Sequence, residues 1–205
     1  MIRFTLVTSW LLLLLFSIGA LFWYNDWKYK LPTPVPKDYQ SIPLGTKIKL
    51  LENLTGNGQK PVFLHFYNPK CPCSRFNKSH FQSLVREHSN DIRFIVVVMS
   101  DKVYSTEKIQ SKIGLKIPVI FDQSLAAQCG VYSTPQAAIL DKNQLLYYRG
   151  NYNSSRYCTD KKTAYAQIAL EGMLKSQKLP ILNAEALKSY GCTMPVCKSR
   201  IFLLI

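Results

Sequence analysis

Two cysteines that lie one residue apart are the chemically most distinctive feature of the sequence. Cys71 and Cys73 flank a proline in the segment HFYNPKCPCSRFN, and Ser74 follows directly. Thiols this close can form a strained disulfide, hold a soft metal ion, or lie in the core as small apolar side chains. The surrounding sequence has to distinguish these three possibilities.

The position of Cys71 favours a reactive thiol. It follows an apolar run, residues 61–67, that is typical of a buried strand, and it precedes a segment with helical periodicity. Backbone N–H groups and the positive end of the dipole at a helix start stabilise a thiolate, and Lys70 and Arg75 add positive charge. We therefore predict that Cys71 is a nucleophile, and we disfavour the reading in which both thiols are inert.

The elements expected around this segment form an alternating pattern. Apolar, β-branched runs predict strands, periodic segments predict helices, and the turn formers DKN predict a hairpin. Asp160 is expected to cap the last helix. The predicted strands are 61–67, 92–100, 116–122, 135–140 and 144–150, and the predicted helical segments are 74–89, 124–130 and 160–177.

Two segments in this order resemble the thioredoxin superfamily. FYNPKCPCSRF resembles its active-site segment, and CGVYSTPQAAILDKNQLLYYRG resembles the stretch of membrane-tethered redoxins that leads to a cis-proline and a hairpin. The resemblance covers roughly residues 45–178 and extends to an uncharacterised bacterial family of anchored redoxin-like proteins. It implies an α/β thioredoxin-like fold, a central mixed sheet flanked by helices, with Pro135 cis and, together with Thr134, opposite Cys71.

The resemblance also exposes one departure from the family pattern. The family carries its second thiol in a Cys-x-x-Cys arrangement, but here the fourth position is Ser74 and the extra thiol is Cys73. We expect Cys71, Cys73 and Pro135 to be the catalytic residues, with Cys73 as the nearest resolving thiol and Thr134 binding substrate.

The loop after the hairpin is expected to form one wall of the site. If Pro135 begins a strand beside the site, the returning strand brings the loop RGNYNSSRYCTD back to the same end of the sheet. Arg149 or Arg156 would then bind substrate and lend positive charge to Cys71. Cys158 would be a second resolving thiol, or it would pair permanently with Cys192 and staple the last helix.

The remaining thiols and the buried histidine are expected to have structural roles. Cys129 is expected to be a small buried residue, with a resolving role as the alternative. Cys192 and Cys197 are expected to form a structural disulfide, within the C-terminal segment or back to the domain. His65 lies in a predicted buried strand and is expected to be a core histidine with a satisfied hydrogen bond.

The N-terminal segment predicts a membrane anchor. Residues 4–24 contain no charged side chain and are long enough to cross a bilayer, after a cytoplasmic stub of residues 1–3. A cleaved signal peptide is the alternative, disfavoured by the length of the run and its aromatic end. We expect a proline-rich tether at 25–44, the domain at 45–180 and a tail at 181–205.

The net charge and the number of cysteines indicate in which compartment the protein lies and which partners it can bind. The net charge is +14, but the basic residues are scattered, so we expect contact with membrane lipid through residues 4–24 and no nucleic acid. Six cysteines favour an oxidising compartment. The prediction is a single-pass protein of the inner membrane with its domain on the periplasmic side.

Several functions fit these residues. The leading one is a membrane-tethered thiol–disulfide oxidoreductase that acts on exported proteins with thiols or disulfides and needs no cofactor or metal. A copper-handling module is the runner-up, because paired thiolates suit Cu(I). A peroxidase is disfavoured because Asn68 replaces the threonine that such enzymes use. A non-catalytic binding domain is the last alternative.

Overall fold

The computed structural model describes residues 2–50, 54, 60–155, 158–177 and 184–194. The chain divides into two compact units, Met1–Pro32 and Thr33–Ile205, which are described separately. The first unit is essentially one helix, and the second is an α/β domain that contains the cysteine segment.

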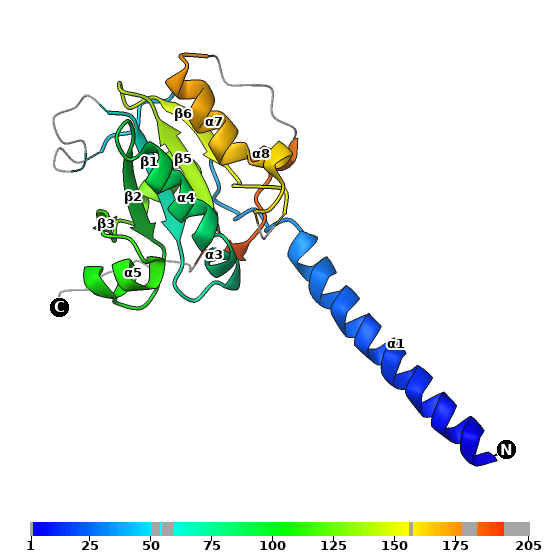
Figure 1. Ribbon diagram of the computed structural model, residues 1–205. Coiled ribbons are helices and arrows are strands. Elements are labelled where there is room, and N and C mark those ends of the chain that lie inside the picture. The colour runs from blue at the N-terminus through cyan, green and yellow to red at the C-terminus, as the bar shows by residue number, and fades with distance from the viewer. Residues whose placement is uncertain (1, 51–53, 55–59, 156–157, 178–183, 195–205) are drawn as a thin grey trace, which may run out of the picture. The chain divides into compact units, whose positions relative to one another are not determined.

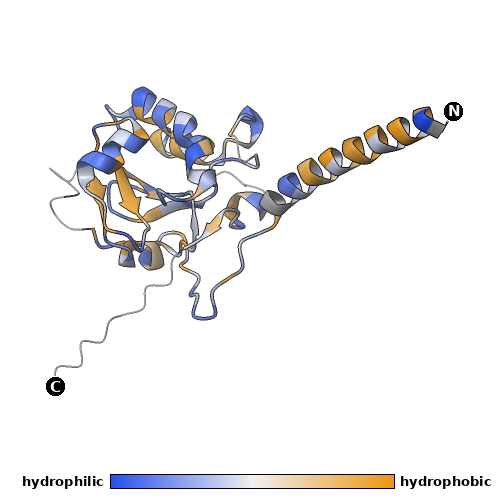
Figure 2. Cartoon of the chain, turned by 90° about the horizontal axis from the view of Figure 1, so that it is seen from below, coloured by the Kyte–Doolittle hydropathy of each residue, from blue (hydrophilic) through white to orange (hydrophobic). Residues whose placement is uncertain are grey.

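Helix α1, Ile2–Lys30, accounts for nearly all of the first unit. Its stretch Arg3–Trp27 is long and apolar enough to cross a membrane, and none of its most apolar part is buried within the protein. Figure 2 shows the almost continuous hydrophobic colouring of this helix. Length and composition of this kind fit a membrane anchor and also a signal sequence.

The second unit is built on a mixed five-stranded sheet in the order β3-β2-β1-β5-β6 (Figure 1). Strand β1 pairs in parallel with β2 and antiparallel with β5, β2 pairs in parallel with β3, and β5 and β6 form the expected hairpin. The strands are β1 Val62–Tyr67, β2 Arg93–Val98, β3 Val119–Ile120, β5 Gln136–Leu140 and β6 Leu146–Gly150.

Helices cover both faces of the sheet, because β1 and β2 are apolar on both sides. One core joins the sheet to α4, α5 and α7 through residues such as Phe63, Phe81 and Leu170. The opposite core joins it to α6 and to Ile48, Leu50 and Leu54 through Leu64, Leu125 and others. The helices are α3 Pro72–Phe76, α4 Lys78–His88, α5 Thr106–Ile113, α6 Ser124–Cys129 and α7 Tyr165–Leu174.

This arrangement is the thioredoxin-like fold expected from the sequence, with local differences. The predicted helix 74–89 is divided into α3 and α4 at Asn77. Helix α5 was not predicted, although Ser105 caps its N-terminus and Gly114, in the left-handed region, ends it. Asp160 caps the short 3-10 helix Lys161–Thr163 instead of the last helix, which begins at Tyr165.

The segments expected as a tether and a tail also differ from the prediction, because parts of both pack on the domain. Thr33 and Tyr39, from the predicted tether, donate hydrogen bonds to Ser189 and Gly130. The C-terminal segment forms helix α8, Ala184–Leu187, and strand β7, Cys192–Thr193. Strand β7 pairs with the two-residue strand β4, Ser133–Thr134, in a second small sheet.

Candidate functional site

Cys71 lies where β1 ends and α3 begins, as predicted. It is the N-cap residue of α3 in an extended conformation, and Pro72 occupies the first turn, where no intrahelical N–H partner is needed. The Cys71 N–H donates to the Asn68 carbonyl at 3.0 Å, which closes the preceding turn. The neighbouring Lys70 ammonium forms an exposed ion pair with Asp101 at 2.9 Å.

A disulfide joins Cys71 to Cys192 from the C-terminal segment. The S–S distance is 2.09 Å, the Cα atoms are 6.1 Å apart, and the two residues are separated by 121 positions in sequence. The disulfide partner of Cys71 is therefore Cys192 and not Cys73, which was the expected partner. Of the two alternatives for Cys158, the permanent bond to Cys192 is not formed.

Strand pairing holds the two cysteines together. Cys192 in β7 is the antiparallel partner of Thr134 in β4, and Thr193 is the partner of Ser133. The Cys71 sulfur lies 3.4 Å from the Thr134 carbonyl oxygen. The Thr134–Pro135 peptide bond is cis, as expected. The structure thus brings Cys71, Thr134, Pro135 and Cys192 together.

Cys73 completes a cluster of three sulfur atoms. The Sγ atoms of Cys71, Cys73 and Cys192 all lie within 4.8 Å of one another, and Cys71 and Cys73 are buried. Ser74, which replaces the family's second thiol, is also buried, and its hydroxyl oxygen accepts a hydrogen bond from the Asn68 N–H at 3.4 Å. Ser74 therefore fixes the loop that carries Cys71.

Close backbone contacts hold the C-terminal segment over the site. The Thr33 N–H donates to the Ser189 carbonyl at 2.8 Å, and the Thr33 hydroxyl donates to the Gly191 carbonyl at 3.1 Å. Gly191 has φ +146, and a Cβ placed on it would overlap the Thr134 carbonyl oxygen. Only glycine allows this approach. The residue before Cys192 is thus adapted to the close pairing of β7 with β4.

Arg149 lies elsewhere than predicted. In β6 it is the cross-strand partner of Ala138, whose side chain belongs to the core that contains α6. Its guanidinium donates to the Gly130 carbonyl at 2.7 Å and to the Tyr39 hydroxyl. Because side chains alternate along a strand, the register of the hairpin places the Arg149 side chain on the side of the sheet that faces α6. Arg156 lies outside the described residues.

Cys158 is neither bonded to Cys192 nor joined to Cys71. Its thiol lies 3.1 Å from the side-chain oxygen of Asn77, the residue between α3 and α4, and donates to it. Burial raises the pKa of the Cys158 thiol to about 12. The loop therefore does approach the active-site helix, but it presents a thiol that is protonated at neutral pH.

Two expectations about core residues are confirmed. Cys129 is fully buried at the end of α6, and burial raises the pKa of its thiol to about 12. His65 is buried in β1, stacks on Phe81 with ring centroids 4.1 Å apart, and its Nδ1 lies 2.7 Å from the Tyr152 hydroxyl. Burial lowers the pKa of His65 to about 3, so the ring is neutral at pH 7.

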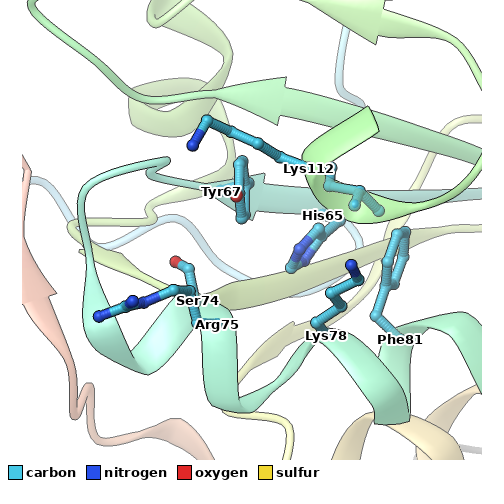
Figure 3. A pocket seen from close by; sticks show the side chains of 8 residues that line it. His65, Tyr67, Ser74, Arg75, Lys78, Phe81 and Lys112 are labelled. Carbon is cyan, nitrogen blue, oxygen red and sulfur yellow. The ribbon is translucent and has the colours of Figure 1, made fainter. Parts of the chain in front are cut away.

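A small cavity lies behind α3. Figure 3 shows residues from β1, α3, α4 and α5 around it. Its volume of about 20 Å³ is comparable to that of one water molecule. The cavity is too small for a peptide or an organic substrate. The lining residues are His65, Tyr67, Ser74, Arg75, Lys78, Phe81, Lys112 and Ile113.

Cys192 forms a disulfide back to the domain, which was one of the two predicted alternatives, but its partner Cys71 was not predicted. One local signal was available, since Gly191 precedes Cys192 and a lone glycine before a cysteine allows close backbone approach. The spacing gives no direct sign of the pairing, because six cysteines allow 15 complete sets of disulfides.

Comparisons with known proteins concern the domain and its fold. A family model described as "Domain of unknown function (DUF6436)" matches residues 43–196. No curated protein matches the sequence.

Solved structures share the architecture at low sequence identity. A hypothetical protein from Sinorhizobium meliloti 1021 is similar with a TM-score of 0.60 and 19% identity, covering 76% of this chain and 96% of that one. An uncharacterised conserved protein from Geobacillus kaustophilus gives 0.61 and 18%, covering 82% and 100%. The thioredoxin domain of a thiol-disulfide oxidoreductase from Bacteroides vulgatus gives 0.46 and 11%, covering 60% and 98%. These likenesses concern the fold, and a function has to be inferred from the residues of this chain.

Proposed function

This chain belongs to the family described as "Domain of unknown function (DUF6436)", and we propose from the geometry of its cysteine cluster that it is a thiol–disulfide oxidoreductase. The observation that carries the proposal is the Cys71–Cys192 disulfide, which joins a helix-start cysteine to a strand paired with Thr134 beside a cis-proline. In this proposal Cys71 is the attacking thiol and Cys192 is the resolving thiol.

The exchange balances as two successive thiol–disulfide substitutions. In the reduced domain the Cys71 thiolate attacks one sulfur of a substrate disulfide, forms a mixed disulfide, and releases the other substrate sulfur as a thiolate that takes a proton from water. The Cys192 thiolate then attacks the Cys71 sulfur, forms the Cys71–Cys192 bond, and releases the second substrate thiolate. The substrate gains two electrons and the domain loses them; the reverse sequence oxidises a substrate dithiol.

The contacts around β7 support this assignment. Cys192 is held by backbone pairing and not by a rigid helix, so it can leave and return as the mixed disulfide forms and resolves. Thr134 and Pro135 are proposed to bind the substrate backbone once β7 has moved. Cys73, within 4.8 Å of both bonded sulfurs, is placed to intercept either of them.

The proposed site of action is outside the cytoplasm. Helix α1 has the length and apolarity of an anchor, and a domain with a disulfide between distant cysteines is typical of oxidising compartments. We propose that the domain is tethered to the inner membrane on its periplasmic side and that exported proteins with thiols or disulfides are its substrates.

Exchange assays on the full chain in detergent would test the proposal. With a model peptide disulfide, Cys71→Ser should abolish exchange. The double variant Cys73→Ser with Cys192→Ser should accumulate a mixed disulfide between Cys71 and the peptide, because neither neighbouring thiol can then resolve it. Cys129→Ala is the matched control, because Cys129 is fully buried in the opposite core, and it should exchange at the rate of the unmodified chain. Normal exchange by Cys71→Ser would refute the proposal.

A further inference from the structure

Reduction of the disulfide would leave three cysteine thiols at one place. The sulfur atoms of Cys71, Cys73 and Cys192 come from three different positions: the end of the β1 loop, the first turn of α3, and strand β7. They lie within 4.8 Å of one another although one of them is more than a hundred residues away in sequence. Cys71 and Cys73 are buried, and Cys192 is partly exposed.

We propose that the reduced domain binds one Cu(I) ion through these three thiolates. Thiolate is a soft ligand and selects soft ions such as Cu(I). Structural zinc sites are almost always tetrahedral with four protein ligands, whereas in the part of the chain that the structure describes, three cysteines alone make up this group. Three sulfur ligands from the described residues suit the low coordination number of Cu(I) better than the tetrahedral geometry of zinc.

Metal binding and disulfide formation exclude each other at this site. A dithiol reductant first delivers two electrons and two protons to Cys71–Cys192 and becomes a cyclic disulfide itself. Cu(I) then replaces the protons of the three thiols, which are released to solvent, with no change in the oxidation state of copper. The proposal rests on the reducibility of this disulfide and not on exchange with a substrate.

Mass action determines how strongly Cu(I) binding favours reduction of the Cys71–Cys192 disulfide. A ligand that binds only the reduced form shifts the equilibrium toward it by a factor of about 1 + [L]/Kd. With free Cu(I) at about 100 times its dissociation constant, the ratio of reduced to oxidised domain at a fixed thiol–disulfide poise should rise about 100-fold. Cu(I) therefore holds the domain in its reduced form.

Anaerobic titration of the full chain in detergent would test the site. The protein is reduced, freed of reductant, and titrated with Cu(I) against a chromophoric Cu(I) chelator. We expect one tightly held ion per chain, an ultraviolet thiolate-to-copper band, and three sulfur neighbours by X-ray absorption. The oxidised chain should leave the copper with the chelator.

Single substitutions separate this cluster from the other thiols. Cys71→Ser, Cys73→Ser and Cys192→Ser should each lower the Cu(I) affinity at least tenfold. Cys158→Ser is the matched control, because a serine hydroxyl can keep the hydrogen bond to Asn77, and its affinity should be unchanged. Cys197→Ser should also leave the affinity unchanged.

Several outcomes would overturn the proposal. Equal copper binding by the oxidised and reduced chains would do so, as would unchanged affinity in Cys192→Ser or two sulfur neighbours in place of three. Zinc binding at the same thiols in preference to Cu(I) would also contradict it. Loss of exchange in a chain that still binds Cu(I) with three sulfurs would refute the proposed oxidoreductase function and leave the metal site standing.

Discussion

His65 shows how a single buried side chain near the site depends on its surroundings. It lies on β1, six positions before Cys71, and is buried between Phe81 and Tyr152. Protonation would place a charge in an apolar core, where Nδ1 of the ring pairs with the Tyr152 hydroxyl. The neutral ring is therefore part of what stabilises the sheet beneath the active-site helix.

This neutral histidine predicts that the domain loses stability in mild acid. The pKa of His65 is lowered by burial to about 3, below its ordinary value of 6.5, so between these values the unfolded chain binds the proton and the folded chain does not. The stabilisation is complete above about pH 6.5 and is lost as the pH falls toward 3. By pH 5 the free energy of unfolding should have dropped by about 2 kcal/mol from this group.

Urea unfolding at several pH values would measure the effect. The double variant His65→Phe with Tyr152→Phe removes the ring and also avoids leaving the Tyr152 hydroxyl without its partner. Between pH 7 and pH 5, the free energy of unfolding of this double variant should fall by about 2 kcal/mol less than that of the unmodified chain. An equal pH dependence in both proteins would show that His65 is not buried in its neutral form.

At the scale of elements, strand β7 carries Cys192, the disulfide partner of the helix-start residue Cys71. The pairing of β7 with β4 aligns Cys192 with Thr134. Thr33, which lies near the start of the second unit, donates hydrogen bonds to the carbonyls of Ser189 and Gly191 just before β7. The segment just after α1 and the segment that carries Cys192 are therefore in direct contact. Any change that lifts β7 from β4 should weaken the disulfide without touching a cysteine.

Gly191→Ala is predicted to weaken the Cys71–Cys192 disulfide. The added Cβ would overlap the Thr134 carbonyl oxygen, which is backbone and cannot rotate away. Overfilling a well-packed site costs about 1–3 kcal/mol, which corresponds to a change of about 5- to 150-fold in an equilibrium. Titration with a dithiol redox buffer should show the disulfide of the variant to be reduced at least about fivefold more readily.

Gly45→Ala is the matched control for that substitution. Gly45 also has a positive φ, +85, but a Cβ there would meet no atom within 4 Å. It therefore reproduces the backbone strain without the overlap at Thr134, and its disulfide should titrate like that of the unmodified chain. Equal effects of the two substitutions would mean that general destabilisation, and not the seating of β7, is responsible.

The same elements show which parts of the structure the sequence could predict. Apolar runs and turn formers predicted the five strands of the main sheet and the hairpin, because local pattern determines which face of each is buried. The position of Cys71 followed from the strand and helix around it. The partner of Cys71 and the orientation of Arg149 did not, because both depend on tertiary pairing: β7 with β4, and the register of β6 on β5.

At the scale of the whole molecule, helix α1 and the domain differ in how much apolar surface they expose. The helix exposes large apolar side chains over most of its length, whereas the domain carries two apolar cores beneath a polar, basic surface. Exposed apolar surface of this extent is unfavourable in water and favourable in a bilayer. This difference supports the proposal that the domain works at a membrane surface.

Fractionation of cells that express the full chain would test this arrangement. The chain should remain with the membranes after an alkaline carbonate wash and keep its full mass, because an anchor is not removed. A chain that begins at Thr33 should appear in the wash. A shortened protein in the soluble fraction of cells that express the full chain would instead identify the N-terminal helix as a cleaved signal sequence.

The central claim, that Cys71 and Cys192 form the reversible disulfide, is tested most directly by mapping the disulfides by mass spectrometry across a series of dithiol redox buffers. Trypsin should release residues 71–75, which contain Cys71 and Cys73, linked to residues 189–198, which contain Cys192 and Cys197. Fragmentation of the linked peptides identifies the bonded sulfurs. We predict a Cys71–Cys192 bond that disappears on reduction and returns on oxidation, while Cys129 and Cys158 remain thiols throughout. A lasting Cys158–Cys192 bond, or a Cys71–Cys73 bond as the main oxidised form, would contradict the account.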